Sequence, residues 1–188
     1  KEPAFSKADI LSEECKATGA TNLLVKTPEG IKAYNSDFLG VRMWLSEVAE
    51  DLKGVKILIV GLGGAGKADA AESLGMEVIR MNRTVRDSTT HPLDEFRQYF
   101  READIIIYNI PTAIPELKEL TESDFAADRP KHILEANYKD PSMAEILKPF
   151  GSKAVYPGGR TWLLYQAVTG YEILTGEKPD LRRMSDVL

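Results

Sequence analysis

The sequence feature that most constrains the fold of this chain is an apolar run that breaks into closely spaced glycines. Residues 55–60 are mostly β-branched and aliphatic, which predicts a strand buried on both faces of a sheet. Gly61, Gly63 and Gly66 follow directly, and helix-forming residues come next. This spacing is typical of a dinucleotide-binding turn, because glycine lets the backbone turn sharply and approach a pyrophosphate at the start of a helix. The alternative is a plain strand-to-helix turn that binds nothing.

Composition limits the classes of partner. The chain has 188 residues, of which 43% are hydrophobic and 28% charged, enough for a packed core in one or two domains. The formal net charge is −5 and the basic residues are scattered, so we expect a small-molecule partner and no nucleic acid. A single cysteine, Cys15, and the lack of a long apolar run favour a cytoplasmic protein without a disulfide or a membrane span. His91 and His132 lack metal-ligand spacing, so no metal is expected.

Hydrophobic periodicity predicts the elements on the N-terminal side of the glycines. The pattern indicates a helix at residues 6–16 that carries Cys15 and ends at Gly19. Strands at 22–26 and 31–34 should form a hairpin across a turn that contains proline and glycine. A helix should follow residue 35, with Trp44 packed in the core.

Alternation of strands and helices after the glycines predicts the fold class. Buried strands are expected at residues 76–81, 104–109, 132–136 and 153–156, and a helix should open at Pro92. This order indicates an α/β fold, a Rossmann-type doubly wound parallel sheet that binds ligands at the carboxyl ends of its strands. The helix expected at residues 161–174 is apolar on most faces, so it should pack deeply between two bodies.

The turn after the second strand of this sheet bears on the choice of cofactor. An NAD site usually places an acidic residue here, about 20 residues past the first glycine, to accept a hydrogen bond from the ribose 2′-hydroxyl. This chain has Asn82, Arg83 and Thr84 instead. A guanidinium can pair with a 2′-phosphate through two hydrogen bonds, so the residues favour NADP over NAD. A basic turn in solvent is the alternative.

Five stretches taken together resemble the shikimate dehydrogenase family, which interconverts 3-dehydroshikimate and shikimate with NADP(H). The first runs from Lys1-Glu2 through a helix to Ala-Thr-Asn-Leu-Leu-Val, and the second is Asn-Ser-Asp at 35–37. The others are the glycine turn, the Asn-Arg-Thr turn and Gly-Arg-Thr-Trp-Leu-Leu-Tyr-Gln at 159–166. The resemblance implies part of a second α/β substrate domain at residues 1–37, an NADP-binding Rossmann domain at 38–160, and C-terminal helices at 161–188 that return to the substrate domain.

The same resemblance implies roles for individual residues. Lys1 and Asp37 would be a catalytic pair that moves a proton while the nicotinamide moves a hydride. Groups that would hydrogen-bond the substrate are Asn22, Asp37, Tyr138 and Gln166. Groups that would hold the cofactor are Gly61, Gly63, Gly64 and Ala65 at the pyrophosphate, Asn82, Arg83 and Thr84 at the 2′-phosphate, and Gly159 and Trp162 at the nicotinamide.

Structural alternatives exist for four of these residues. Asp37 could serve only as the N-cap of its helix. Lys1 could be a solvated residue at a chain end, Gln166 a helix residue bonded to backbone, and Tyr138 a packed ring with its hydroxyl in water.

The sequence also departs from the family pattern. The family carries a strand with two serines and an Asn-Val-Thr segment before the catalytic lysine, whereas this chain opens on that lysine, so we expect a fragment that binds cofactor better than it turns over substrate. Apolar surface on the hairpin and the 161–174 helix should then cause poor solubility or association through that face, with a homodimer as one form. Trp162 stands where the family has Met, and Asp87 follows Arg86 where a second basic residue is usual. Two alternatives therefore remain, a quinate/shikimate dehydrogenase with altered cofactor preference and a non-catalytic or truncated dinucleotide-binding module.

Overall fold

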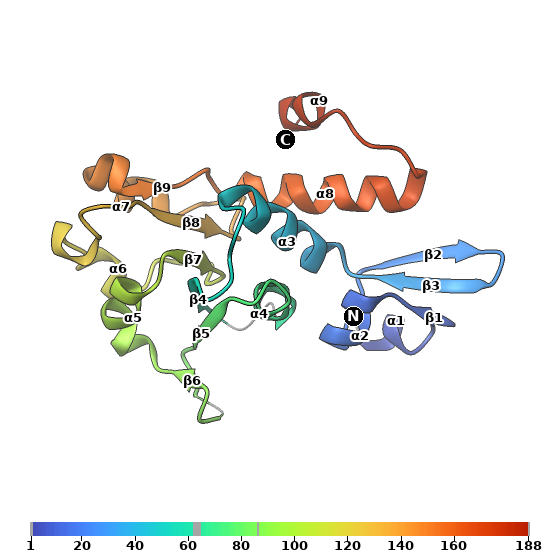
Figure 1. Ribbon diagram of the computed structural model, residues 1–188, viewed down its shortest axis with the longest axis horizontal. Coiled ribbons are helices and arrows are strands. Elements are labelled where there is room, and N and C mark those ends of the chain that lie inside the picture. Colours follow the sequence, from blue (N-terminus) through green and yellow to red (C-terminus); the bar gives the residue numbers. More distant parts are fainter. Residues whose placement is uncertain (1, 62–64, 86, 188) are drawn as a thin grey trace.

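Two sheets organise the chain in the computed structural model, which describes residues 2–61, 65–85 and 87–187 (Figure 1). The larger sheet has six strands in the order β6-β5-β4-β7-β8-β9, and every pairing in it is parallel. β4 comes first in the chain and lies between β5 and β7, so the strand order reverses direction at β4. This arrangement confirms the predicted α/β fold with a Rossmann-type, doubly wound parallel sheet.

The predicted strands of this sheet are all present, with small shifts of their ends. Their bounds are β4 Lys56–Val60, β5 Glu77–Met81, β7 Ile105–Tyr108, β8 Lys131–Glu135 and β9 Ala154–Val155. The structure adds β6, Thr90–His91, which pairs with the end of β5. Two residues are too few to show an alternating pattern, which is why the sequence did not predict this strand.

Helices cover both faces of the sheet, and each face has its own core. Leu58 and Val60 of β4 join a buried cluster with Phe96 and Phe100 of α5, Phe96–Glu102. The alternate residues of β4, with Trp44, belong to a second cluster under α3, Ser36–Val48, and α4, Ala65–Glu72. Trp44 is 5% exposed, so the prediction of core packing is confirmed. The shorter helical segments are η1 Leu93–Glu95, α6 Pro115–Lys118, η2 Glu122–Asp124, α7 Met143–Leu147 and η3 Lys148–Lys153.

The smaller sheet contains the predicted hairpin, but the helix predicted at residues 6–16 is wrong. β2, Leu23–Thr27, pairs antiparallel with β3, Gly30–Tyr34. Residues 6–16 do not form one helix. α1 is Glu2–Phe5, and β1, Ile10–Leu11, pairs parallel with β3 before α2 begins at Glu13 and ends at Thr18. Backbone N–H groups around β1 donate to β3 carbonyls, as in Asp9 N to Ile31 O at 2.8 Å, and these bonds replace those of a continuous helix.

The predicted end of this helical region is nevertheless correct. Gly19 follows α2 with a φ of 61°, the left-handed conformation that glycine adopts at low cost. Cys15 on α2 is fully buried, as expected for a packed residue.

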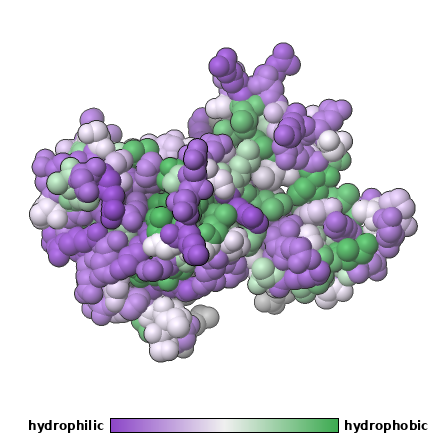
Figure 2. Space-filling view, viewed as in Figure 1, coloured by the Kyte–Doolittle hydropathy of each residue, from purple (hydrophilic) through white to green (hydrophobic). Residues whose placement is uncertain are grey.

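The prediction that the C-terminal helix lies deeply buried is wrong for this chain. α8, Arg160–Thr175, packs along α3, but the buried residues it contributes are Val168 and Thr169. Leu174 is 61% exposed, and Figure 2 shows apolar surface over α8 and beside the hairpin. α9, Leu181–Asp186, folds back over α8 (Figure 1). Within the described ranges, every helix is too short or too polar to cross a membrane.

A buried ion-pair cluster on the α5 side of the sheet should make stability depend on pH. The Asp124 side chain has no exposed surface and accepts hydrogen bonds from Arg97 Nη2 at 2.9 Å, Arg101 Nε at 2.8 Å and Thr121 N at 2.7 Å. Burial raises the pKa of Asp124, but these donors outweigh burial and hold the pKa at about 2, below its ordinary value of 3.8.

We expect Asp124→Asn to lower the free energy of unfolding by about 2 kcal/mol at about pH 5. Because the folded-state pKa lies below the unfolded value, this stabilisation is present above pH 3.8 and is lost as the pH falls toward about 2. Urea unfolding at about pH 5 and about pH 2 measures the difference between parent and variant, which should shrink at the lower pH. Asp128→Asn, at an exposed position, is the matched control. Equal effects of the two substitutions would contradict the assignment.

Candidate active site

The glycine turn begins at the point where the ends of three strands meet. Gly61 follows β4 with a φ of 86°, its N–H donates to Met81 O of β5 at 2.8 Å, and its carbonyl accepts from Asn109 Nδ2 at 3.1 Å. A Cβ atom at Gly61 would lie 2.9 Å from Ile110 Cγ1, so both conformation and space require glycine. Gly63 and Gly64 lie outside the described residues. Ala65 is the first residue of α4, so a helix starts directly beyond the turn.

Asn109 shows that this edge of the sheet fits a polar ligand. Its Oδ1 atom is buried and has no hydrogen-bond donor in the described part of the chain. The amide cannot exchange its ends without turning an oxygen toward Gly61 O, because Nδ2 already donates there. An unpaired buried acceptor is costly, and the hydroxyl groups of a dinucleotide are donors of the kind it lacks. Together with the glycine turn at the strand ends, this supports a fit to a dinucleotide.

The predicted 2′-phosphate turn lies at the same edge of the sheet, after β5. Asn82 N donates to His91 O of β6 at 3.0 Å, and Asn82 Nδ2 donates to Thr84 O at 3.3 Å. Asn82 therefore stabilises the turn with its own side chain and joins it to β6. Arg83 and Thr84 are exposed, and the guanidinium is therefore accessible to a ligand.

Asp87, one of the departures from the family pattern, has a structural role in this loop. One of its carboxylate oxygens accepts from Thr89 Oγ1 at 2.7 Å, Thr89 N at 2.9 Å and Thr90 Oγ1 at 2.9 Å. The hydrogen bonds from Thr89 and then Thr90 lower the pKa of Asp87. Arg86 lies outside the described residues.

Asp37 and Gln166 meet where α3 and α8 cross. Gln166 Nε2 donates to Asp37 Oδ1, and both side chains are half-buried. The N-cap of α3 is Asn35, whose Oδ1 accepts from Phe38 N at 3.2 Å, so the alternative that Asp37 is only the cap is wrong. The helices can approach because Gly40 has no side chain, since a Cβ there would lie 2.8 Å from Gln166 N.

Asn22 joins this group through the residue that precedes Asp37. Asn22 Oδ1 accepts from Ser36 N at 2.9 Å, and Asn22 Nδ2 donates to Ser36 Oγ at 3.0 Å. These bonds tie the beginning of β2 to the beginning of α3. Three of the residues expected to bind substrate, Asn22, Asp37 and Gln166, therefore lie together. Lys1, the expected partner of Asp37, lies outside the described residues.

Tyr138 and Gly159 come together at the carboxyl ends of β8 and β9. A Cβ atom at Gly159 would lie 2.2 Å from Asn137 O and 3.1 Å from Tyr138 Cα, so the two backbones touch there. The Tyr138 side chain is 37% exposed, with Lys139 Nζ 6.0 Å from the centroid of its ring. Tyr138 thus lies open to solvent beside the glycine expected at the nicotinamide.

Two charged residues near these positions make contacts that were not predicted from the sequence. Glu135, fully buried at the end of β8, accepts from Ser142 N at 2.7 Å and Tyr156 Oη at 2.5 Å. Burial, and then Glu135, raise the pKa of Tyr156. Lys67 on α4 is 5% exposed, and its Nζ lies 4.4 Å from the centroid of the Trp162 ring. A charged residue at the end of an apolar strand was a signal for Glu135, but the Lys67 contact joins segments far apart in the sequence.

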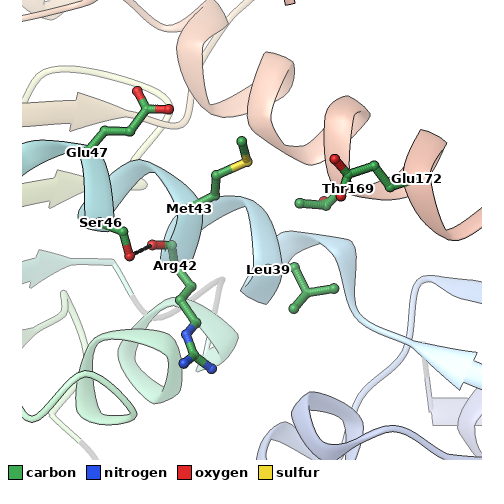
Figure 3. Close-up of a pocket in the computed structure, with 7 residues that line it drawn as sticks. All are labelled: Leu39, Arg42, Met43, Ser46, Glu47, Thr169 and Glu172. Carbon is green, nitrogen blue, oxygen red and sulfur yellow. Dashed lines mark hydrogen bonds between the residues drawn. The ribbon is translucent and has the colours of Figure 1, made fainter. Parts of the chain in front are cut away.

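A hollow of about 530 Å³ lies between α3 and α8, apart from the predicted site residues (Figure 3). Its lining is Leu39, Arg42, Met43, Ser46, Glu47, Thr169 and Glu172. In the described ranges, no group of three His, Cys, Asp or Glu residues is arranged to hold a metal ion.

Comparisons with known proteins agree with this geometry. The family model of the D-isomer specific 2-hydroxyacid dehydrogenase NAD-binding domain matches residues 22–134. The shikimate dehydrogenase (NADP(+)) of Pyrococcus furiosus is 28% identical over 197 residues, which cover 100% of this chain and 72% of that protein. The enzyme of the same name from Caldicellulosiruptor saccharolyticus is 31% identical over 192 residues, 92% of this chain and 68% of that protein. The crystal structure of shikimate dehydrogenase from Aquifex aeolicus shares the fold, with a TM-score of 0.79 at 20% identity, over 99% of this chain and 73% of that one. The chain therefore matches the model of an NAD-binding domain, and it also matches a 31%-identical shikimate dehydrogenase over more than two thirds of that relative's length. On these grounds, the chain belongs to the shikimate dehydrogenase family.

Proposed function

We propose that this protein is an NADP-dependent shikimate dehydrogenase that reversibly reduces 3-dehydroshikimate to shikimate, in the biosynthesis of aromatic amino acids. The observation that carries the proposal is the group formed by Asn22, Asp37 and Gln166 at the start of α3. The group offers a carboxylate and two amides, which suit a substrate with several hydroxyl groups. Relatives that align with the whole chain are named shikimate dehydrogenase (NADP(+)), which supports the same reaction.

The chemistry assigned to the protein is proton transfer and orientation. When bound, NADPH would supply a hydride to the carbonyl carbon of the substrate. The carbonyl oxygen then needs a proton, and the proposed donors are the Lys1 ammonium and the Asp37 carboxyl group acting as a pair. Gln166, which donates to Asp37 Oδ1, would keep this carboxylate oriented. Asn22, Gln166 and Tyr138 would hydrogen-bond the substrate hydroxyls.

The cofactor residues follow the edge of the larger sheet. Gly61, Gly63, Gly64 and Ala65 would hold the pyrophosphate, Asn82, Arg83 and Thr84 the 2′-phosphate, and Gly159 with Trp162 the nicotinamide. The domain division proposed with these roles is a substrate part at residues 1–37, an NADP-binding domain at 38–160 and a return to the substrate part at 161–188.

The proposal also includes a cytoplasmic location and a homodimer. Exposed apolar side chains support self-association, with Leu24 and Ile31 of the hairpin each 38% exposed and Leu174 of α8 61% exposed. Analytical ultracentrifugation measures the oligomeric state.

The activity is tested by following NADP⁺ reduction with shikimate, with quinate and with neither substrate, and by repeating each assay with NAD⁺. Turnover with shikimate and NADP⁺ supports the proposal, whereas faster turnover of quinate would identify the protein as a quinate dehydrogenase. NADPH binding without turnover of either substrate would instead support a non-catalytic dinucleotide-binding module.

Arg83→Ala should weaken NADPH binding by about 10- to 100-fold and change NADH binding by less than about twofold. The expected loss comes from charge-assisted hydrogen bonds to the 2′-phosphate, which NADH lacks. Titration of each cofactor by its own fluorescence measures both dissociation constants. Arg182→Ala removes another exposed guanidinium, on α9, and should leave both constants unchanged. If Arg83→Ala weakened NADPH and NADH binding equally, Arg83 would not bind the 2′-phosphate.

A further inference from the structure

A buried lysine and an indole connect the two helices that flank the predicted cofactor site. Lys67 is the third residue of α4, which follows the glycine turn, and Trp162 is the third residue of α8, which follows Gly159. Lys67 is 5% exposed, and its Nζ lies 4.4 Å from the centroid of the Trp162 ring. This distance is well inside the range of a cation–π interaction, and such contacts are stronger when they are shielded from water.

Hydrogen bonding does not set the orientation of the Trp162 ring. Its Nε1–H is buried and has no acceptor among the residues that the structure describes. The ring packs against the apolar cluster of α3, α4 and β4, which limits the space in which it can turn. The ammonium over the ring adds a directional electrostatic contact, which favours one orientation of the indole within that space.

We propose that Lys67 is a positioning residue that acts through Trp162, holding the indole as the wall against which the nicotinamide ring of NADP(H) packs. This inference rests on the proposed function, which assigns Trp162 to the nicotinamide end. Lys67 Nζ lies over one face of the ring, so a charge on α4 contacts a side chain contributed by α8. A methionine at position 162, as in the family pattern, would offer no aromatic face to the ammonium.

The test separates the nicotinamide from the rest of the cofactor. Lys67→Met keeps the length of the side chain and removes its charge, and Lys67→Arg retains a cation that can lie over the ring. Isothermal titration calorimetry measures the dissociation constants of NADPH and of 2′-phospho-ADP-ribose, which keeps the pyrophosphate and the 2′-phosphate but lacks nicotinamide. We expect Lys67→Met to weaken NADPH binding about 10-fold and 2′-phospho-ADP-ribose binding less than about twofold. Lys67→Arg should restore NADPH binding to within about threefold of the parent.

A spectroscopic measurement gives an independent readout. The chain has two tryptophans, so Trp44→Phe leaves Trp162 as the only indole emitter. In that background, Lys67→Met should shift the emission maximum, and NADPH should quench the emission. The calorimetric experiment uses proteins that keep both tryptophans, so its result remains valid even if Trp44→Phe impairs folding.

Three outcomes would overturn the inference. Equal weakening of NADPH and 2′-phospho-ADP-ribose would place Lys67 at the phosphates, and unchanged NADPH binding would remove its role. A parent protein that binds no NADPH would end both this inference and the proposed function. If the Lys67 substitutions changed NADPH binding as expected but the protein turned over neither shikimate nor quinate, the proposed activity alone would be wrong.

Discussion

Asp37→Asn should lower kcat for shikimate oxidation by about 10²- to 10⁴-fold while the dissociation constant of NADPH changes less than about twofold. Asparagine has almost the same shape, and its Oδ1 can still accept from Gln166 Nε2, so the junction of α3 and α8 should persist. What the substitution removes is a group that can exchange a proton and carry a negative charge beside the substrate. Steady-state kinetics and a cofactor titration on the same preparation measure both quantities.

The matched control for Asp37 is the true cap of the same helix. Asn35→Ala removes the acceptor for Phe38 N, which as an N-cap is worth about 1 kcal/mol, and also the donor to Thr18 Oγ1 and Ala20 O, so it should cost more than about 1 kcal/mol of stability. Asp37→Asn should cost less than this in urea unfolding, because Asp37 does not cap α3. If Asp37→Asn destabilised the protein more than Asn35→Ala did, and kcat fell only in proportion to unfolding, the catalytic role would be lost.

Gly40→Ala should lower the free energy of unfolding by about 3 kcal/mol, although alanine is the better helix former. A Cβ at Gly40 would lie 2.8 Å from Gln166 N and 3.0 Å from Tyr165 C, and both are backbone atoms of α8 that cannot rotate away. The helices would have to separate. Since Gly40 touches the backbone of the residue whose side chain holds Asp37, kcat/KM for shikimate should fall as well.

Gly170→Ala on α8 is the control, because it makes the same chemical change in a helix with open space around the new methyl group. It should stabilise the protein by about 0.5–1 kcal/mol through helix propensity alone. Urea unfolding of both variants gives the comparison. A Gly40→Ala protein as stable as Gly170→Ala would show that the crossing of α3 and α8 is not tight.

Much of the larger sheet could be predicted because its signals are local. Runs such as residues 55–60 and 104–109 are long enough to display an aliphatic pattern, and the structure places strands at both. β1 and β6 have two residues each, and their pairing partners, not their own sequences, make them strands. The helix expected at residues 6–16 is wrong for the same reason, since β3 accepts hydrogen bonds from this segment.

The candidate site was partly predictable in the same sense. The glycine spacing and the Asn82–Arg83–Thr84 turn are contiguous, so their residue types alone suggested a nucleotide and a 2′-phosphate. The role of Asp37 could not be separated from helix capping, because Asn35, Ser36 and Asp37 are all residue types favoured at helix starts. The hydrogen bond from Asn35 to Phe38 distinguishes them.

By itself, the sequence determined the fold class, the position of the glycine turn and the membership of a family, because each depends on residue types in a fixed local order. Only the tertiary structure decided which distant residues meet. Gln166 reaches Asp37 because Gly40 lets two helices touch, and Lys67 in the first turn of α4 reaches Trp162 in the first turn of α8. The first of these contacts joins residues 129 positions apart in the sequence, and both depend on how the whole chain packs.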